Sequence, residues 1–235
     1  MINEAMIFAA GLGKRMRPLS LNRPKPLIKI NNGTLLSNNI NKLVKSKIKN
    51  IIVNAYHHPQ KIVEETKNYS KQVRVLVEKE RLETGGGFLN AIKNKCFFTD
   101  NPILLVNGDI FWINKYYNSI NFIRDLWNPK KMDILICLKK REDFFGYRGT
   151  GDFDCSNPTD TLLKLQSKKK SPYVFTGLQI IKQEIVVKKR KKIFSIREQI
   201  IESARKKRLF GYVDKNSWFH IGTVKDYRQF RDNFL

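Results

Sequence analysis

Runs of consecutive apolar residues alternate along the first part of the chain with longer segments in which apolar side chains recur at helical spacing. Short unbroken apolar runs are typical of strands that are covered on both faces. The unbroken apolar runs at residues 5–10 and 103–106 and the mostly apolar segments at residues 50–54, 73–77 and 133–138 predict strands. The intervening segments predict helices at residues 34–46, 59–69, 86–93 and 115–127. Strands that alternate with helices in this way are typical of a parallel sheet with helices on both of its faces.

The pattern changes after Lys140, where Gly146, Gly149 and Gly151 fall within a short stretch. Beyond this stretch the sequence predicts strands at residues 161–165 and 173–181 and helices at residues 195–206 and 224–233. No Pro/Ser-rich linker, internal repeat or low-complexity segment separates the two parts. We therefore expect one domain that extends over residues 1–235.

Composition excludes several classes of protein. Of the 235 residues, 41% are hydrophobic, which suffices for a sizeable core and excludes a disordered chain. No apolar run approaches the roughly 18 residues of a membrane-spanning helix, so no membrane association is expected. Glu4 precedes the first apolar run and basic residues follow it, which is the reverse of a secretory signal. The three cysteines are scattered and lack metal-ligand spacing, so we expect reduced thiols in a cytoplasmic protein.

The chain is strongly basic, with 45 Lys and Arg against 21 Asp and Glu and a net charge of +24. Such a surface attracts any polyanion, including RNA, an anionic membrane or a nucleotide. The lysines are spread along the chain, however, and the densest run, at residues 188–192, lacks the interleaved aromatic residues of a stacking platform. A solvated surface is therefore the favoured interpretation, and we expect no nucleic-acid partner.

A glycine-rich segment directly follows the first predicted strand, with the sequence Ala10-Gly11-Leu12-Gly13-Lys14-Arg15. Its backbone N–H groups can surround phosphate oxygens, and its cations add positive charge at the same place. The segment is not a Walker A loop, and it fails the dinucleotide fingerprint because Met16 stands where a third glycine belongs. Phosphate binding and an ordinary turn remain the two interpretations.

Two further segments favour ligand binding. Pro24-Lys25-Pro26 holds a lysine between two prolines, which restrict the backbone so that the ammonium can be directed at low entropic cost. Glu83-Thr84-Gly85-Gly86-Gly87 lies between a predicted strand and a helix, and its three costly glycines suggest close approach of a flat or anionic group. An exposed loop lysine and a flexible connector are the respective alternatives.

Asn107-Gly108-Asp109 follows the fourth predicted strand. In open α/β sheets, ligands bind beyond the carboxyl ends of the strands. A carboxylate at this place suits Mg²⁺, which takes few protein oxygens and several from phosphate or water. An aspartate in a common turn is the alternative.

Together and in this order, the four segments resemble the sugar-1-phosphate nucleotidyltransferases. The resemblance is greatest to the N-acetylmuramate-1-phosphate uridylyltransferases of bacterial cell-wall recycling, which lack an added left-handed β-helix domain. Phe175-Thr176-Gly177 and Trp218-Phe219-His220-Ile221-Gly222-Thr223 also match late motifs of the family. The resemblance implies an α/β, Rossmann-like and GT-A-like fold, with a mostly parallel but mixed sheet and helices on both faces. It further implies a nucleotide-binding half at residues 1–112 and an acceptor-sugar half at residues 113–235.

The resemblance also implies a reaction between UTP and a sugar 1-phosphate. A phosphate oxygen of N-acetylmuramate 1-phosphate attacks the α-phosphorus of UTP in line, which transfers UMP, forms the UDP-sugar and expels pyrophosphate. Positioning and charge neutralisation would carry this catalysis. The implied roles are catalysis by Arg15 and Lys25, nucleotide binding by Ala10, Gly11, Gly13, Lys14, Glu83, Gly85, Gly86 and Asn107, acceptor binding by Asp152, Thr176 and Gly177, and metal binding by Asp109 and His220. Glu83 would read either the base or the acceptor sugar.

His220 stands where many family members carry a second metal-binding aspartate. Mg²⁺ is the expected cofactor, but a neutral imidazole suits Mn²⁺, Co²⁺ or Zn²⁺ better. Three roles are open for His220: it ligates a softer metal, it acts through a metal-bound water, or it bonds a substrate phosphate directly. A packed histidine near Trp218 is the alternative.

Other functions remain open on the sequence alone. One is a guanylyl- or thymidylyltransferase that acts on mannose 1-phosphate or glucose 1-phosphate, because a change of base alters only a few contacts. A second is a non-catalytic nucleotide or polyanion binder, which His220 and the basic excess support. A third is an RNA-binding protein, which predicts a steeply salt-dependent affinity for RNA. A monomer or a small homo-oligomer is expected in each case.

Overall fold

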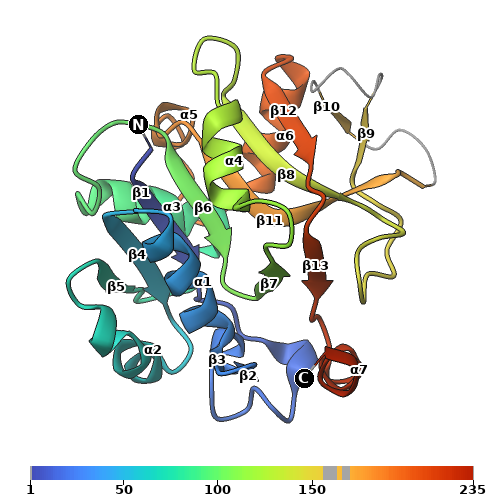
Figure 1. Ribbon diagram of the computed structural model, residues 1–235. Helices are drawn as coiled ribbons and strands as arrows, with labels where there is room; N and C mark the ends of the chain where they lie inside the picture. The colour runs from blue at the N-terminus through green and yellow to red at the C-terminus, as the bar shows by residue number, and fades with distance from the viewer. Residues whose placement is uncertain (1, 156–162, 166–169, 235) are drawn as a thin grey trace.

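The computed structural model describes residues 2–155, 163–165 and 170–234. Their central feature is one large mixed sheet (Figure 1). Four parallel strands form one half of this sheet in the order β6-β1-β4-β5. Their bounds are β1 (Glu4–Phe8), β4 (Asn50–Ala55), β5 (Val73–Val77) and β6 (Ile103–Asn107). Every residue of β4 is buried, which is typical of a strand that helices cover on both faces.

The other half of the sheet lies beyond β6 and is mixed. Its strands among the described residues are β8 (Ile134–Lys140), β9 (Phe153–Cys155), β10 (Leu163–Leu165), β11 (Tyr173–Ile181) and β12 (Leu209–Val213). β11 runs antiparallel to both β6 and β8, whereas β12 is parallel to β8. The pairing of β11 with β8 shifts register between Phe175 and Gln179, a bulge that changes the direction of the side chains there.

Helices cover both faces of the sheet. Successive side chains of β1 point to opposite faces, and both sets are buried. Ala5 and Ile7 belong to one apolar core, whereas Met6 belongs to a second. The first core includes apolar residues of α1 (Leu35–Lys45), α2 (Pro59–Thr66) and α4 (Ser119–Leu126). The second includes residues of α3 (Glu83–Lys93), α5 (Glu184–Val187) and α6 (Arg197–Arg205). Figure 1 shows α1 and α4 in front of the sheet and α3 behind it.

A small third layer forms where the chain leaves β6. β7 (Ile110–Ile113) pairs antiparallel with β13 (Ser217–His220), and the rings of Trp112 and Trp218 stack with centroids 4.8 Å apart. α7 (Val224–Phe234) packs Phe230 against this pair. The short pair of β2 (Lys29–Ile30) and β3 (Gly33–Thr34) precedes α1. Because His220 lies opposite Ile110 in the pairing, the chain's last strand ends beside Asp109.

The predicted architecture, a mostly parallel but mixed sheet with helices on both faces, is confirmed. The sequence did not predict the strands β2, β3, β7, β9, β12 and β13 or the short helix α5. The helix predicted at 115–127 begins only at Ser119, after Asn118 accepts hydrogen bonds from the backbone as an N-cap. Of the strand predicted at 161–165, residues 163–165 form β10 and residues 161–162 lie outside the described part of the chain. Among the described residues, no helix has the length and apolar character needed to cross a bilayer.

Candidate active site

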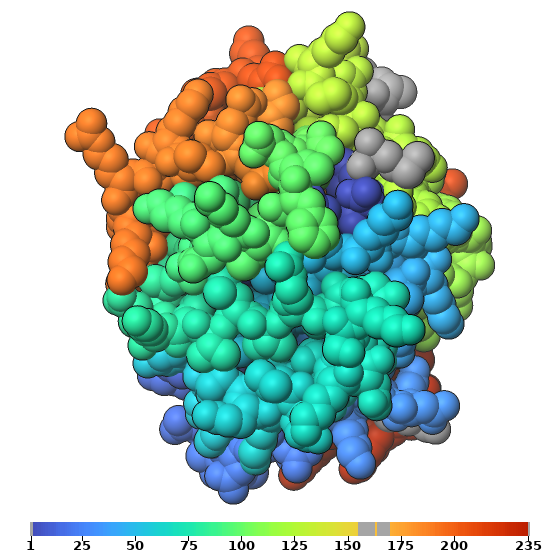
Figure 2. All heavy atoms as spheres, turned by 90° about the vertical axis from the view of Figure 1, so that its left-hand side faces the viewer, coloured from blue at the N-terminus to red at the C-terminus, as the bar shows by residue number. Residues whose placement is uncertain are grey.

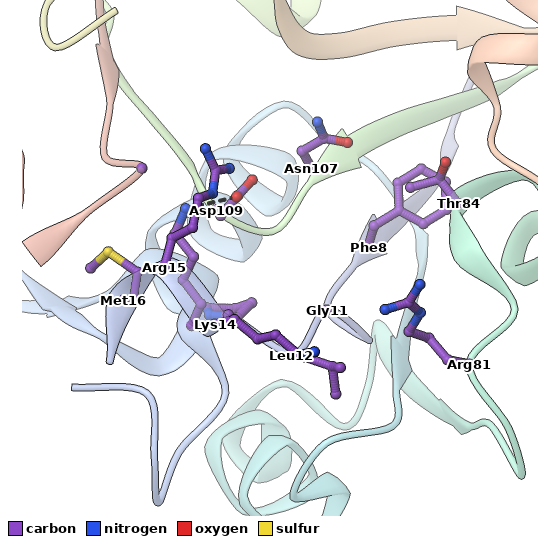
Figure 3. Close-up of a pocket in the computed structure, with 14 residues that line it drawn as sticks. Phe8, Gly11, Leu12, Lys14, Arg15, Met16, Arg81, Thr84, Asn107 and Asp109 are labelled. Atoms are coloured by element: carbon purple, nitrogen blue, oxygen red, sulfur yellow. Dashed lines mark hydrogen bonds and ion pairs between the residues drawn. The ribbon is translucent and has the colours of Figure 1, made fainter. Parts of the chain in front are cut away.

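Arg15, Lys25 and Asp109 line one cavity of about 450 Å³, here called the first cavity (Figure 3). The loops after β1 and β6 form most of its wall, so it lies at the carboxyl ends of two adjacent parallel strands, where α/β sheets bind ligands. In Figure 3, Asp109 and Arg15 lie on one side of Gly11 and Leu12, whereas Arg81 and Thr84 lie on the other. The three charged residues that the sequence singled out therefore share one site.

The glycine-rich loop is fixed by contacts at Gly13 and is open at Gly11. Gly13 adopts a left-handed conformation with φ of 61° and starts a 3-10 turn, Lys14–Met16, a conformation that glycine adopts at low cost. Met16 is fully buried, and the Ser20 hydroxyl donates to the Gly13 carbonyl at 2.7 Å. A Cβ atom at Gly11, in contrast, would meet no described atom within 4 Å. The backbone at Gly11 is thus accessible to a ligand in the first cavity.

Lys25 and Asp109 form an ion pair across the first cavity, with Nζ and Oδ2 2.8 Å apart. Lys25 lies in a short 3-10 turn, Lys25–Leu27, and is buried. Gly108 allows the end of β6 to approach β1, because its N–H donates to the Phe8 carbonyl at 2.9 Å and a Cβ there would collide with that carbonyl. Desolvation in the cavity acts to raise the pKa of Asp109, but the Lys25 ammonium outweighs it and the pKa is lowered. Asp109 is therefore a carboxylate at neutral pH.

His220 lies at the edge of this site rather than in the wall of the first cavity. Its ring packs edge-on against Phe144 and Tyr147, with centroids 6.0 and 5.8 Å away. Gly222, which does line the first cavity, has no Cβ to crowd the Nε2 atom of His220. Desolvation and then the charge of Lys25 lower the pKa of His220, although Asp109 acts in the opposite direction. The imidazole is thus neutral at pH 7 and able to accept a metal ion or a proton.

The side chains fit a cation that takes most of its ligands from substrate. No cluster of three His, Cys, Asp or Glu side chains able to hold a metal ion occurs among the residues that the structure describes. Asp109 offers a carboxylate whose side chain is 41% exposed and whose Oδ2 already accepts from Lys25. Mg²⁺ is commonly bound by one or two carboxylates together with substrate phosphates. The donor set therefore suits a metal that arrives with a nucleotide better than a preformed metal centre.

A second cavity, of about 260 Å³, adjoins the first and shares Thr84 and Asn107 with it. Asp152 lies in its wall and accepts a hydrogen bond from the Phe175 N–H at 3.1 Å. A third cavity, of about 390 Å³, shares Phe8, Gly11, Leu12, Arg81 and Thr84 with the first. Its remaining lining residues include Ala10, Asn54 and Glu83. The predicted residues Ala10, Glu83, Asn107 and Asp152 thus all lie around the connected cavities.

Gly85 and Gly86 contact their own chain and are absent from the walls of the three cavities. Their N–H groups both donate to the Phe194 carbonyl, at 2.9 and 3.0 Å. A Cβ at Gly85 would overlap the Phe194 ring, and one at Gly86 would overlap the Lys192 carbonyl. Packing within the fold therefore accounts for both glycines, and their contact with a base stays a prediction.

Thr176 and Gly177 are predicted to bind the acceptor sugar, but neither lines any of the three cavities. Thr176 is buried and its hydroxyl donates to the Cys137 carbonyl at 3.0 Å. Gly177 has φ of 95°, and a Cβ there would come within 2.8 Å of the Asn107 side-chain nitrogen. Its neighbour Phe175 lines the second cavity, because the bulge in β11 changes which side chains face outward.

Sequence reasoning missed two cations of these cavities. Arg81 lines the first and third cavities, and its guanidinium lies 3.7 Å from the Glu83 carboxylate. Arg197 lines the second cavity. Arg81 stands two residues before the predicted glycine segment, so its place beside that segment was a usable signal. Arg197 follows the basic run at 188–192, and nothing local distinguishes it from the surface lysines there.

Comparison with known proteins decides the family. The model of the nucleotidyl transferase family matches residues 4–235. The chain belongs to the nucleotidyl transferase family. The expected enzyme class, a sugar-1-phosphate nucleotidyltransferase, is confirmed by this match and by the relatives that follow.

Two relatives of this nucleotidyltransferase match over nearly its whole length. N-acetylmuramate alpha-1-phosphate uridylyltransferase of Caulobacter vibrioides is 28% identical over 225 residues, with 93% of this chain and 91% of that protein covered. D-glycero-alpha-D-manno-heptose 1-phosphate guanylyltransferase of Campylobacter jejuni is also 28% identical, with 98% and 99% covered. Among solved structures, HddC from Yersinia pseudotuberculosis in complex with GMP-PN has a TM-score of 0.75 at 20% identity, with both chains fully covered. This last likeness shows a shared fold.

Proposed function

We propose that this nucleotidyltransferase transfers UMP from UTP to N-acetylmuramate 1-phosphate in the cytoplasm, as a step of cell-wall recycling. The observation that carries the proposal is the single cavity lined by Arg15, Lys25 and Asp109 beside the open backbone at Gly11. The Caulobacter vibrioides relative supports the choice of UTP and of this sugar. In this proposal residues 1–112 bind the nucleotide and residues 113–235 supply most of the acceptor site.

The nucleotide occupies the first and third cavities in this proposal. Its phosphates lie against the backbone N–H groups from Gly11 to Gly13, with Lys14 and Arg15 as counter-charges. The base lies in the third cavity next to Ala10 and Glu83. Asn107 marks the passage to the second cavity, where the sugar of the acceptor binds near Asp152.

The reaction then needs orientation and charge compensation from the protein. A phosphate oxygen of the acceptor forms a bond to the α-phosphorus of UTP while the bond to the bridging β-phosphate oxygen breaks, and pyrophosphate leaves. Lys25 is buried in the wall of the first cavity, and its ammonium compensates charge on both reacting phosphates. Burial strengthens this effect because the surrounding dielectric is low. Arg15 stabilises the pyrophosphate that departs.

A divalent cation completes the charge balance. Asp109 would hold it, with the neutral imidazole of His220 as a second donor for a softer ion such as Mn²⁺ or Co²⁺. When bound, the cation neutralises phosphate charge and favours departure of pyrophosphate. Lys25 must then share the Asp109 carboxylate or release it.

A guanylyltransferase is the second candidate. The Campylobacter jejuni relative, a guanylyltransferase, matches at the same 28% identity over 98% of the chain. Several yeast mannose-1-phosphate guanyltransferases match as well, for example that of Debaryomyces hansenii at 24% identity. A change of base requires only different contacts in the third cavity.

A substrate panel separates these functions. Pyrophosphate release is measured with UTP, GTP and dTTP, each with the 1-phosphates of N-acetylmuramate, mannose, glucose and D-glycero-D-manno-heptose. We expect the highest kcat/KM for UTP with N-acetylmuramate 1-phosphate. Fastest turnover with GTP and a neutral sugar would instead establish the guanylyltransferase. Absence of pyrophosphate release in every combination, with Mg²⁺, Mn²⁺ and Co²⁺, would contradict an enzymatic function.

A further inference from the structure

The second cavity contains one cationic side chain among the residues that line it. Its wall is formed by three polar residues, one acid, one cation and four apolar residues, namely Thr84, Asn107, Ser195, Asp152, Arg197, Phe153, Phe175, Ile196 and Ile200. Asp152 already accepts a hydrogen bond from the backbone at Phe175. A ligand in this cavity therefore meets Arg197 as its source of positive charge.

The guanidinium of Arg197 has no hydrogen-bond or ion-pair partner within the described residues, although acids are close in the sequence. Glu198 pairs with Lys191 at 3.2 Å, and Glu202 pairs with both Lys189 and Lys206, at 3.1 and 2.7 Å. The neighbouring carboxylates are thus occupied by lysines, and the Arg197 guanidinium is left available. A guanidinium without a partner is suited to bind a carboxylate or a phosphate through two parallel hydrogen bonds.

The backbone of Arg197 is held against α3. The N–H groups of Gly85 and Gly86 donate to the Phe194 carbonyl, and the Ile196 N–H donates to the Thr84 hydroxyl at 3.0 Å. Phe194 itself is buried. Figure 2 shows the segment around residues 185–200, in orange, directly beside the teal and green surface of residues 80–100. Arg197 therefore projects from a docked segment, which favours specific pairing over the loose contacts of a mobile surface arginine.

The arrangement of the two cavities sets which part of an acceptor reaches Arg197. Thr84 and Asn107 line both cavities, whereas Lys25 and Asp109 line only the first and Arg197 only the second. An acceptor whose phosphate meets Lys25 in the first cavity must place its sugar in the second. The group that meets Arg197 is therefore a substituent of the sugar and is distinct from the reacting phosphate.

We propose that Arg197 pairs with a carboxylate on the acceptor sugar and makes the enzyme select a carboxylate-bearing sugar 1-phosphate over a neutral one. This inference rests on the proposed function, because it assumes that the second cavity takes the acceptor. The lactyl carboxylate of N-acetylmuramate is a group of this class. The carboxylate lies on the Arg197 side of the cavity, away from Asp152, because the two negative charges repel each other.

The test compares two acceptors that differ in the lactyl group alone, N-acetylmuramate 1-phosphate and N-acetylglucosamine 1-phosphate. The ratio of their kcat/KM values is measured for the unmodified enzyme, Arg197→Ala and Arg197→Lys. A matched control is Arg205→Ala, which removes an exposed arginine from the other end of the same helix. Thermal melting of each variant shows that it is folded.

We expect Arg197→Ala to lower the preference for the carboxylate-bearing acceptor roughly 10- to 100-fold, the range for a charged hydrogen-bonded pair, chiefly through KM. Arg197→Lys should recover part of the preference, because it keeps the charge and loses the planar fork. Arg205→Ala should leave the ratio unchanged. An unaltered ratio in Arg197→Ala, or an enzyme that prefers the neutral acceptor, overturns the role of Arg197 alone. Lack of turnover by the unmodified enzyme with every acceptor overturns the proposed function itself, and this inference with it.

Discussion

Glycine serves two different purposes around the three cavities. At Gly11 a Cβ atom would meet no described atom within 4 Å, so the surrounding protein does not require glycine there. At Gly85 and Gly86 a Cβ would overlap the segment that contains Lys192 and Phe194. Packing explains glycine at the last two positions, and under the proposed function a ligand that approaches the backbone explains it at the first.

Substitution of Gly11 by alanine separates ligand binding from folding. Gly11 lines the first and third cavities, and the added methyl group would meet no described protein atom within 4 Å. We expect the melting temperature to change by less than about 1 °C. The KM for UTP should rise roughly 100-fold, because a small displacement of the phosphates removes the productive geometry. An unchanged KM, measured by pyrophosphate release, would show that the phosphates do not lie against this backbone.

His220 provides a second test at the scale of one residue. Because its imidazole is neutral at pH 7 and lies beside Asp109 and Gly222, it can assist a cation or a phosphate. We expect His220→Ala to lower kcat/KM roughly 10- to 100-fold, the usual cost of removing a residue that supports a metal site. His220→Asp should retain activity with Mg²⁺, since a carboxylate suits that ion. Full activity of the alanine variant with both Mg²⁺ and Mn²⁺ would make His220 a packing residue.

The site residues that could be predicted belong to compact sequence motifs. Arg15, Lys25 and Asp109 each lie within a few residues of glycine or proline, where a special backbone conformation is visible in the sequence. Arg81 and Arg197 could not be assigned in this way. Their significance comes from the cavities that they line, and those cavities exist only after distant segments come together.

At the scale of elements, the docking of residues 192–197 on the start of α3 connects the second cavity with the third. The two hydrogen bonds from Gly85 and Gly86 to Phe194 and the bond from Ile196 to Thr84 fix this contact. Because Ser195 lines both the second and the third cavity, a shift of this segment changes both cavities together.

Gly86→Ala tests this connection. Its methyl group would collide with the Lys192 carbonyl, and such overpacking costs about 1–3 kcal/mol. We expect a measurable fall in the free energy of unfolding in urea, together with a higher KM for the acceptor. Gly11→Ala is the matched comparison, because it adds the same methyl group where there is room. Equal stability of the two variants would contradict the packing role of Gly86.

β7 and β13 escaped prediction because their partners are far away in the sequence. Residues 110–113 are apolar, but they follow the turn at Gly108 so closely that the sequence indicates only the end of β6. They form β7 because β13, from the end of the chain, pairs with them. The mostly apolar segments of the sequence do predict β1, β4, β5 and β6. β1 and β4 are buried almost throughout, as strands covered on both faces are, whereas β5 at the edge of the sheet is only partly buried.

At the scale of the whole molecule, the positive charge is partly balanced within the chain. Lys189, Lys191 and Lys192 of the densest basic run form ion pairs with Glu202, Glu198 and Glu80. Such exposed pairs add little stability, but they reduce the charge that the run presents. The cations that line the first cavity, including Lys14, Arg15 and Lys25, instead face a common space. The arrangement suits a small polyanion such as a nucleoside triphosphate.

Removal of metal should affect activity without affecting the fold. No cluster of three ligating side chains occurs in the described part of the chain, and we expect Mg²⁺ to bind together with UTP. We expect EDTA to abolish pyrophosphate release while the melting temperature changes by less than about 1 °C. Mg²⁺ and UTP together should raise the melting temperature by more than the sum of their separate effects, because each improves the binding of the other. A drop of several degrees with EDTA alone would reveal a structural metal.

The most direct test is a crystal structure of the protein with Mg²⁺ and a UTP analogue that cannot release pyrophosphate. The triphosphate should lie within hydrogen-bonding distance of the backbone N–H groups between Gly11 and Arg15, with its α-phosphate facing Lys25 and the cation on Asp109. A nucleotide bound elsewhere, or phosphates turned away from the Lys25–Asp109 pair, would contradict the account.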